Sequence, residues 1–112
     1  MRAFVAAFNA RDIEAMLALA DDAIEWISVD GAKLSTETAG KAALRSSMTT
    51  YFKSCPTCRS SVEIGTVSAD RVTALETAMW TAAGVERAQR GVSVYEFAGG
   101  RIRRVYYFPV EK

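Results

Sequence analysis

The second half of the chain is a series of strand-like segments separated by turn residues, and this pattern restricts the fold more than any other feature. Four segments are rich in β-branched and aromatic residues, and they span residues 58–68, 71–83, 86–100 and 101–110. The pair Gly99-Gly100 ends the third segment, and glycines accept the positive φ angles of a two-residue hairpin turn. Short strands joined by tight turns predict an antiparallel meander.

The first half of the chain is mainly helical. Apolar residues recur at helical spacing in residues 1–10, 11–22 and 40–55, and Asp12 can cap the second of these segments. Residues 23–31 are β-branched and aromatic, so they predict a single strand between the helices. Helices followed by a meander indicate the α+β class, with the helices on one face of the sheet.

Composition limits the partners and the chemistry. The chain has 112 residues, half of them hydrophobic, and a net charge of +1, which fits one domain over residues 1–112 without nucleic acid as a partner. No apolar run approaches the ~20 residues that span a bilayer, and no signal peptide is recognisable, so we expect a cytoplasmic protein without a membrane partner. Histidine is absent, which removes the commonest general base and most zinc sites. We expect neither a metal nor another cofactor.

The stretch "SCPTC" places Cys55 and Cys58 at the spacing of a redox dithiol or of half a zinc site. The expected helix lies before Cys55, so its negative end raises the thiol pKa and disfavours reactivity. A zinc site needs further ligands, which the chain does not offer in histidine or cysteine. We interpret the motif as a turn with two reduced, partly buried thiols. A redox role and a metal role are the alternatives.

Three short motifs carry a resemblance to a known family. They are "FNARD" between the first two helices, "ADD" before the first strand, and "GGRI" in the last hairpin. With the order of elements, they make nearly the whole chain resemble the nuclear transport factor 2-like superfamily, and within it the SnoaL-like and ketosteroid-isomerase-like bacterial domains. The resemblance implies a cone, in which a curved, mostly antiparallel sheet wraps around three helices. It also implies an apolar pocket at the mouth and homodimers formed through the convex sheet face.

Despite the resemblance, this chain lacks the catalytic residues of ketosteroid isomerases. Those enzymes use a carboxylate base near the end of the first strand, with a tyrosine and a protonated aspartate as oxyanion donors. The corresponding positions in this chain hold Ile27, Phe4 and Ser93. Isomerase activity by that mechanism is therefore not expected.

Alternation along residues 71–83 points to a different carboxylate. Ala74, Glu76, Ala78 and Trp80 share one face of this strand, and the family match turns that face toward the helices. A carboxyl group among apolar neighbours has a raised pKa and can act as an acid or a base. Glu76 is therefore the candidate catalytic residue. The alternatives are a structural carboxylate that pairs with an arginine, or a strand whose opposite face points toward the helices.

The expected pocket is apolar and aromatic. The family register turns Ser93, Tyr95 and Tyr107 inward on the last two strands, and it leaves Tyr106 and Phe108 on the convex face. Tyr95 or Tyr107 would donate a hydrogen bond to a ligand carbonyl. The expected pocket residues are Phe4, Phe8, Trp26, Ile27, Tyr51, Trp80, Ser93, Tyr95, Val105 and Tyr107.

Three functions remain compatible with the sequence. The first is a domain that binds a small apolar molecule without a recognised catalytic set. The second is a SnoaL-like isomerase or cyclase, in which Glu76 transfers a proton on an apolar carbonyl substrate. The third is an assembly module that forms homodimers through the convex sheet face and holds no ligand.

Overall fold

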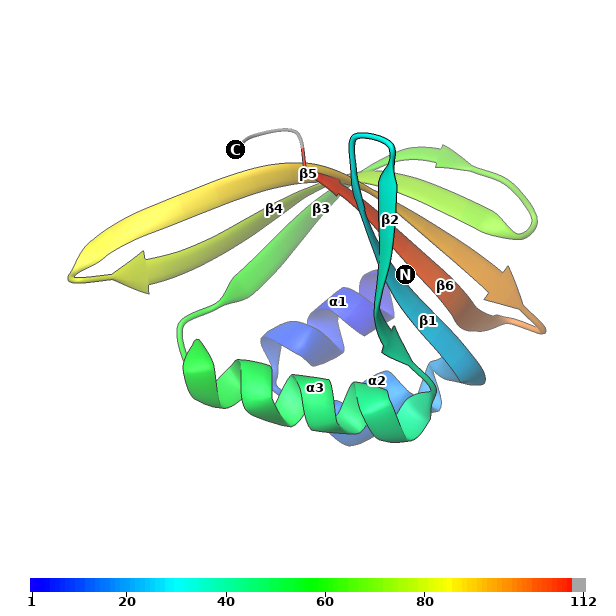
Figure 1. Cartoon of the computed structure of the whole chain (residues 1–112), viewed down its shortest axis with the longest axis horizontal. Helices are drawn as coiled ribbons and strands as arrows, with labels where there is room; N and C mark the ends of the chain where they lie inside the picture. Colours follow the sequence, from blue (N-terminus) through cyan, green and yellow to red (C-terminus); the bar gives the residue numbers. More distant parts are fainter. Residues whose placement is uncertain (110–112) are drawn as a thin grey trace.

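The computed structural model describes residues 1–109 and shows an open sheet with helices against one face (Figure 1). The helices are α1 (Arg2–Asn9), α2 (Ile13–Ala18) and α3 (Lys41–Ser54). The strands are β1 (Ala20–Asp30), β2 (Lys33–Ala39), β3 (Arg59–Val67), β4 (Arg71–Ala82), β5 (Val85–Ala98) and β6 (Arg101–Pro109). Val110, which ends the last predicted strand, lies outside the described residues.

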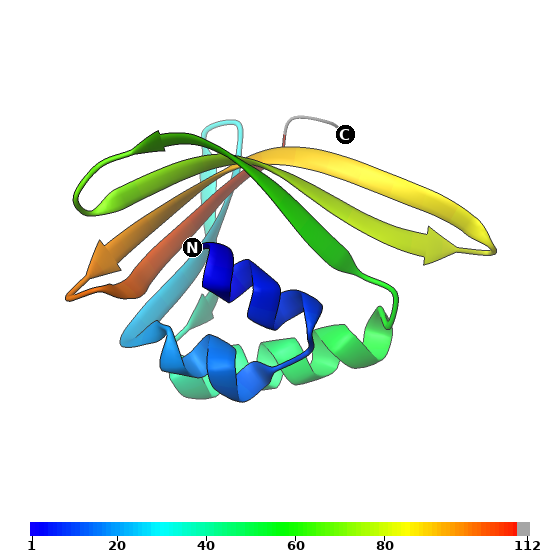
Figure 2. The ribbon, with the colours of Figure 1, turned by 180° about the vertical axis from the view of Figure 1, so that it is seen from behind.

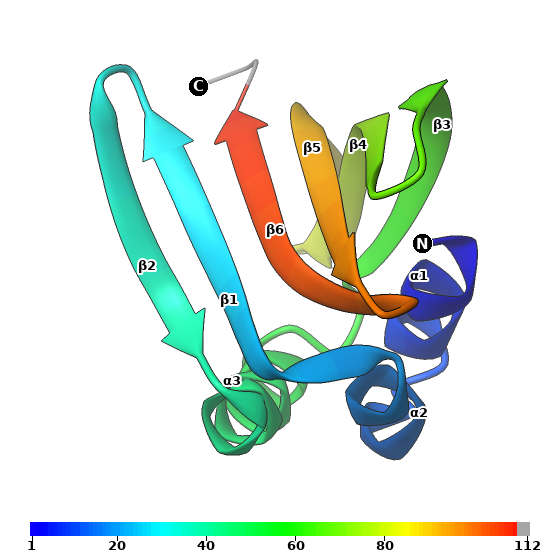
Figure 3. The ribbon, with the colours of Figure 1, turned by 90° about the vertical axis from the view of Figure 1, so that its right-hand side faces the viewer.

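The six strands form one sheet in the order β2-β1-β6-β5-β4-β3. Neighbouring strands are antiparallel except β1 and β6, which pair in parallel with Trp26 opposite Val105. Seen from the side, the sheet curves around the helices, with α2 and α3 below its concave face (Figure 3). The α+β class and the cone with a mostly antiparallel sheet are therefore confirmed.

One strand was not expected from the sequence. We expected a single strand before the third helix, but β1 turns back at Gly31 and pairs with the antiparallel strand β2. Its sequence, "KLSTETA", is mostly polar, and Thr38 is its only residue in the buried class. Because β2 lies at the edge of the sheet, it buries too little to show the alternation that identifies a strand.

The turns fit the residues that form them. Gly99 and Gly100 both have positive φ, so the predicted tight turn between β5 and β6 is confirmed. The turn between β4 and β5 contains Ala83 and Gly84, which also have positive φ. A left-handed alanine costs on the order of 1 kcal/mol, and the long β4–β5 hairpin around it offsets this.

The core lies between the concave sheet face and the helices. The view from behind shows these helices beneath the sheet (Figure 2). From α1, Phe4 is 2% exposed, and it packs edge-on against Tyr95 of β5 with ring centroids 6.4 Å apart. Met16 of α2 and Leu44 of α3 complete the helical side, and Val105 of β6 is fully buried. Burying a large apolar side chain contributes roughly 2 kcal/mol, so these contacts hold the helices under the sheet.

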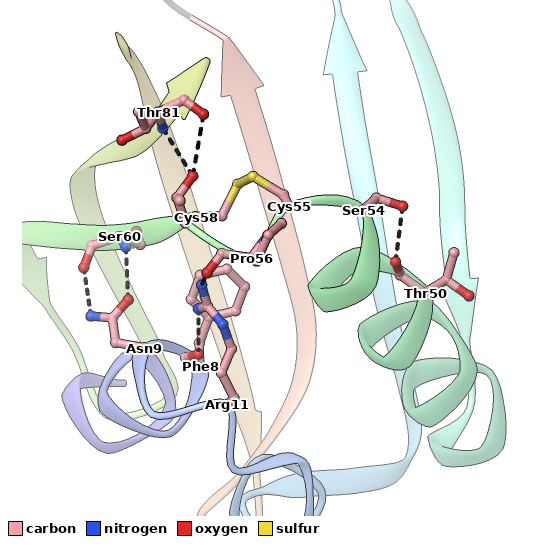
Figure 4. Close-up of a disulfide and its surroundings, with 11 residues drawn as sticks. Phe8, Asn9, Arg11, Thr50, Ser54, Cys55, Pro56, Cys58, Ser60 and Thr81 are labelled. Atoms are coloured by element: carbon pink, nitrogen blue, oxygen red, sulfur yellow. Dashed lines mark hydrogen bonds between the residues drawn. A yellow bond between two sulfur atoms is a disulfide. The ribbon is translucent and has the colours of Figure 1, made fainter. Parts of the chain in front are cut away.

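The two cysteines are not free thiols. Cys55 and Cys58 form a disulfide across the turn that joins α3 to β3, with their Cα atoms 5.4 Å apart (Figure 4). The expectation of two reduced thiols is therefore wrong for this structure. The turn brings the two side chains together because Cys58 N donates a hydrogen bond to the carbonyl oxygen of Cys55 at 3.2 Å.

Candidate functional site

A cavity of about 530 Å³ lies between the concave sheet face and helices α1 and α3. Its wall is largely aromatic and apolar, with Leu44 and Met48 of α3 beside the rings. Seven of the residues predicted from the sequence line it: Phe4, Phe8, Trp26, Tyr51, Glu76, Tyr95 and Tyr107. This volume falls within the range of small-molecule sites in proteins.

Four other predicted pocket residues lie elsewhere. Ser93 is fully buried behind the wall, where it contacts Glu76, and Val105 belongs to the core. Ile27 directly follows Trp26, which lines the cavity, and pairs with Tyr106 of β6, so alternation places it on the outer face. Trp80 shares the face of Glu76, but it lies beyond Met79, which pairs with Arg59 at the start of β3. The cavity lining includes neither Ile27 nor Trp80.

Glu76 is the central polar group of the cavity. Its Oε1 accepts hydrogen bonds from the hydroxyl of Tyr95 at 3.0 Å and from Ser93 Oγ at 3.3 Å. Desolvation by burial raises the pKa of Glu76 above its usual value, although these hydroxyl groups act in the opposite direction. The pKa of Tyr95 is raised well above its usual value, first by burial and then by the neighbouring carboxylate. Tyr95 therefore stays protonated and donates to Glu76.

Ser60 of β3 adds a polar group that the sequence analysis did not identify. It pairs with Ala78 on the neighbouring strand, so both side chains face the cavity. Ser60 Oγ is close enough to the Glu76 carboxylate to oppose the rise of its pKa, but it makes no hydrogen bond of ordinary geometry. The register of the β3–β4 hairpin is the signal that would have placed Ser60 beside Glu76.

Gly91 of β5 allows an aromatic ring to approach the centre of the site. It pairs with Glu76 on one side, and the ring of Tyr107 lies over it. A Cβ atom at Gly91 would lie 2.5 Å from the Tyr107 hydroxyl oxygen, which is shorter than van der Waals contact. Only glycine therefore leaves space for Tyr107 to reach across the strand toward the row of Glu76.

Two charged residues and an aromatic side chain line other parts of the cavity. Glu37 belongs to β2, and Arg59 forms an ion pair with Glu86 of β5. The ring of Tyr51, 38% exposed, packs against Phe8 with centroids 5.7 Å apart. Burial raises the pKa of Tyr51. The cavity thus combines an apolar, aromatic wall with a few separate polar groups, an arrangement typical of small-molecule sites.

On the outer face of the sheet, carboxylates pair with arginines. Glu25 of β1 points outward, where its Oε1 accepts hydrogen bonds from Arg103 Nη1 at 3.0 Å and Arg104 Nε at 3.2 Å. The Arg103 hydrogen bond is the main cause of the lowered pKa of Glu25. Farther along this row, Arg71 Nε donates to Glu96 Oε2 at 2.8 Å.

Within residues 1–109 no helix has the length and apolar character needed to cross a membrane. In the same part of the chain, no cluster of three or more cysteine or acidic side chains is placed to hold a metal ion.

Comparisons with known proteins agree with the fold. The profile of the SnoaL-like domain matches residues 1–105. No protein of curated function matches the chain. Among solved structures, TerC co-crystallised with polyporic acid aligns with a TM-score of 0.78 and 22% identity, over 95% of this chain and 85% of TerC.

Two further structures have the same architecture. An uncharacterised cystatin-fold protein from Novosphingobium aromaticivorans aligns with a TM-score of 0.78 and 22% identity, over 95% of this chain and 92% of its own. A polyketide cyclase assigned only by similarity, from Xanthomonas campestris pv. campestris, aligns with a TM-score of 0.68 and 21% identity. That alignment covers 96% of this chain and 84% of the cyclase. At these identities the likeness establishes the fold alone.

Proposed function

Because the chain belongs to the SnoaL-like domain family, we propose that its cavity binds a small, mainly apolar and aromatic molecule that carries a hydrogen-bonding group. The observation that carries this proposal is an aromatic cavity whose lining holds the Glu76 carboxylate near Ser60. Ser60 Oγ is buried without a hydrogen-bond partner, which costs free energy unless a ligand or water supplies one. TerC, which shares this fold, was co-crystallised with polyporic acid, and this supports a small organic molecule as the ligand.

Filling the cavity tests this proposal. Ala78 lines the cavity, while Thr77, its neighbour on β4, faces the opposite way and pairs with Arg90. We expect Ala78→Phe to abolish the thermal shift that steroids, polyketide-like ketones or fatty acids give with the wild type, and Thr77→Phe to retain it. A ligand at 100 times its dissociation constant stabilises by about 2.7 kcal/mol, which is readily measured. Equal shifts in both variants would exclude this cavity as the binding site.

A second candidate function is proton transfer, and the contact between Glu76 and Tyr95 favours it. A carboxylate whose pKa is raised by burial can remove a proton from the carbon beside a ketone and return it at another position. Tyr95 and Tyr107 both line the cavity, and the hydroxyl of either one can donate a hydrogen bond to the enolate oxygen that develops on the substrate.

Deuterium exchange separates the enzyme from the binding domain. A ketone that shifts the melting temperature is incubated in heavy water, and its α-hydrogens are followed by nuclear magnetic resonance. We expect Glu76→Gln to slow the protein-dependent exchange by about 10²–10⁴-fold, and Glu25→Gln, on the outer face, to leave it unchanged. A Glu76→Gln protein as fast as the wild type would remove the proposed base.

We also propose that two copies pair through the outer, convex face of the sheet. Val92 and Phe108 are opposite each other on β5 and β6, and each is 38% exposed, while Leu34 of β2 is 63% exposed. Large apolar side chains exposed on one face of a sheet favour self-association. Light scattering should show that Val92→Glu lowers the molar mass to that of a monomer, whereas Val85→Glu at the β4–β5 turn does not. A wild type that is already monomeric would refute the proposal.

The cytoplasmic location remains a prediction of the sequence. Disulfides that occur in the cytoplasm are usually transient, catalytic or redox-sensing. If the location holds, the Cys55–Cys58 bond belongs to one of these classes.

A further inference from the structure

The Cys55–Cys58 disulfide lies in the turn between two segments that line the cavity. Tyr51, one helical turn before Cys55, lines the cavity, and so do Arg59 and Ser60 directly after Cys58. Cys55 N donates to the Tyr51 carbonyl oxygen at 2.8 Å, so the disulfide begins at the last residue held by α3. Any movement of this turn therefore moves part of the cavity wall.

Other parts of the molecule hold the same turn (Figure 4). Arg11, in the link between α1 and α2, donates from Nη2 to the Pro56 carbonyl oxygen at 2.8 Å. The backbone N of Thr81, in β4, donates to Thr57 Oγ1 at 2.9 Å. Pro56 and Thr57, the two residues between the cysteines, are thus hydrogen-bonded to different elements. The disulfide fixes the distance between the two ends of this turn, Cys55 and Cys58.

Helix α1 and the α1–α2 link also contact residues next to the disulfide. Asn9 of α1 exchanges two hydrogen bonds of 2.8 Å with the backbone N and O of Ser60. The Arg11 guanidinium also lies 4.8 Å from the ring centroid of Phe52, in the last turns of α3. The α1–α2 link therefore contacts the chain on both sides of the disulfide.

We propose that the Cys55–Cys58 pair is a reversible thiol–disulfide exchange site that low-molecular-weight thiols attack at Cys55, and that its oxidised form holds the α3–β3 part of the cavity wall. Cys55 is partly exposed, while Cys58 is 6% exposed, so an incoming thiol reaches Cys55 first. Glutathione and similar small thiols would therefore modify Cys55 by forming a mixed disulfide with it. Its effect on ligand binding rests on the proposed function of the cavity.

Atoms and electrons balance in this exchange. A thiolate attacks Cys55 Sγ, a bond forms between the two sulfurs, and the Cys55–Cys58 bond breaks. Its electron pair leaves on Cys58, which takes up the proton that the attacking thiol released. A second thiolate then attacks the small-thiol sulfur of the mixed disulfide, and Cys55 leaves as a thiolate that takes up the proton of that second thiol. Two small thiols are thereby oxidised to one disulfide, and the protein pair is reduced by two electrons.

The position of the pair at the end of α3 sets its character. Cys55 is the C-cap of this helix, where the negative end of the macrodipole disfavours a thiolate. A pair of thiols with little thiolate character favours the disulfide and reacts slowly. The redox state of the pair therefore changes slowly with the redox state of the surrounding small thiols, and the pair does not act as a thioredoxin-like catalyst. We call this slow, reversible closure of the α3–β3 turn by the disulfide the latch.

The site of attack is tested with single variants and glutathione disulfide. Cys58→Ser leaves the partly exposed Cys55, and Cys55→Ser leaves the buried Cys58. Intact mass spectrometry should show about tenfold faster formation of the glutathione adduct in Cys58→Ser than in Cys55→Ser. Equal rates, or a faster reaction of Cys58, would overturn the assignment of Cys55.

The latch is tested on the whole chain without any ligand. Hydrogen exchange is compared in the oxidised and the reduced protein, with the double variant Cys55→Ser/Cys58→Ser in both buffers as the control. We expect reduction to speed exchange about tenfold in residues 51–60, to leave β5 unchanged, and to have no effect on the double variant. Unchanged exchange in residues 51–60 would overturn the latch.

The consequence for binding is measured with 1-anilinonaphthalene-8-sulfonate, a fluorescent apolar probe. We expect its dissociation constant to rise about threefold on reduction of the wild type, and not in the double variant. The same constant in both states would overturn the proposed effect on the cavity. If Ala78→Phe binds the probe as well as the wild type, the proposed cavity function fails, while the adduct and exchange experiments still decide the exchange site.

Discussion

The two faces of the sheet treat a carboxylate in opposite ways. On the concave face, Glu76 lies among aromatic side chains and hydroxyl groups, and burial raises its pKa. On the outer face, Glu25 lies between Arg103 and Arg104, and their hydrogen bonds lower its pKa. This contrast indicates that outer-face carboxylates serve cross-strand pairing, whereas the inner carboxylate sits in an environment suited to exchanging a proton with a ligand.

The strongest test of this comparison removes one aromatic ring from each face. Phe4 is 2% exposed under the sheet, whereas Phe108 is 38% exposed on the outer face. We expect Phe4→Ala to lower the free energy of unfolding by about 4 kcal/mol, and Phe108→Ala by less than about 1 kcal/mol. Urea denaturation at low protein concentration measures both. Similar losses would mean that the outer face is as well packed as the core.

Gly91 tests how closely the inner face is packed. A methyl group at this position would overlap the ring of Tyr107, so we expect Gly91→Ala to cost about 1–3 kcal/mol of stability. Thermal denaturation checks the loss. The second change Tyr107→Ala should recover part of it, because it removes the overlapping ring. A Gly91→Ala protein as stable as the wild type would show that Tyr107 moves aside freely.

The pH dependence of stability should differ in sign for the two carboxylates. Because folding raises the pKa of Glu76, the folded protein loses stability as the pH rises from the usual value of 4.5 to the raised value. Glu76→Gln should remove this loss. Folding lowers the pKa of Glu25, so its stabilisation is present above the usual value and is lost as the pH falls through the lowered one.

Stability curves from pH 3 to 8 for Glu76→Gln and Glu25→Gln would check this contrast, each against the wild type. We expect the difference between Glu76→Gln and the wild type to grow as the pH rises above about 4.5. The difference for Glu25→Gln, of opposite sign, should develop below about pH 4.5 and stay constant above it. The same sign for both variants would contradict the environments described for the two faces.

The smallest effect is expected for an ion pair on the outer face. The side chain of Arg71 is 57% exposed while it pairs with Glu96. Since exposed pairs contribute little, we expect Arg71→Ala to change the free energy of unfolding by about 0.5 kcal/mol or less, measured by urea denaturation at low and at high salt. A loss above about 2 kcal/mol would show that the outer row of charges acts as one network.

The sequence allowed a good part of the fold and of the site to be predicted. Alternation put Glu76 and Ala78 on one face of residues 71–83, and the family resemblance turned that face toward the helices. The structure has both residues in the cavity wall. Paired strands joined by tight turns have a definite register, so alternation identifies their faces correctly. Strand-like segments separated by turn residues predicted the long meander, and the glycine pair predicted the turn at Gly99 and Gly100.

The failures have local physical causes. Ile27 was placed by the match to the isomerase base position, but it directly follows Trp26, which lines the cavity, so strand alternation turns Ile27 to the other face. Alternation gives the face of a residue and not the extent of the cavity. Trp80 therefore shares the face of Glu76 but lies outside the cavity lining. The polar edge strand β2 and the pairing of Cys55 with Cys58 depend on neighbours distant in the fold or on redox conditions, which local patterns do not contain.

The parallel pairing of β1 with β6 has a consequence for biosynthesis. Glu25 contacts Arg104, which is 79 positions later in the chain. At 5–20 residues per second, a ribosome needs roughly 4–16 s to make that stretch, and β1 has no partner on that side until it is finished. Nascent chains stalled before β6 should therefore expose an apolar strand edge and recruit chaperones, whereas the released full-length chain should not.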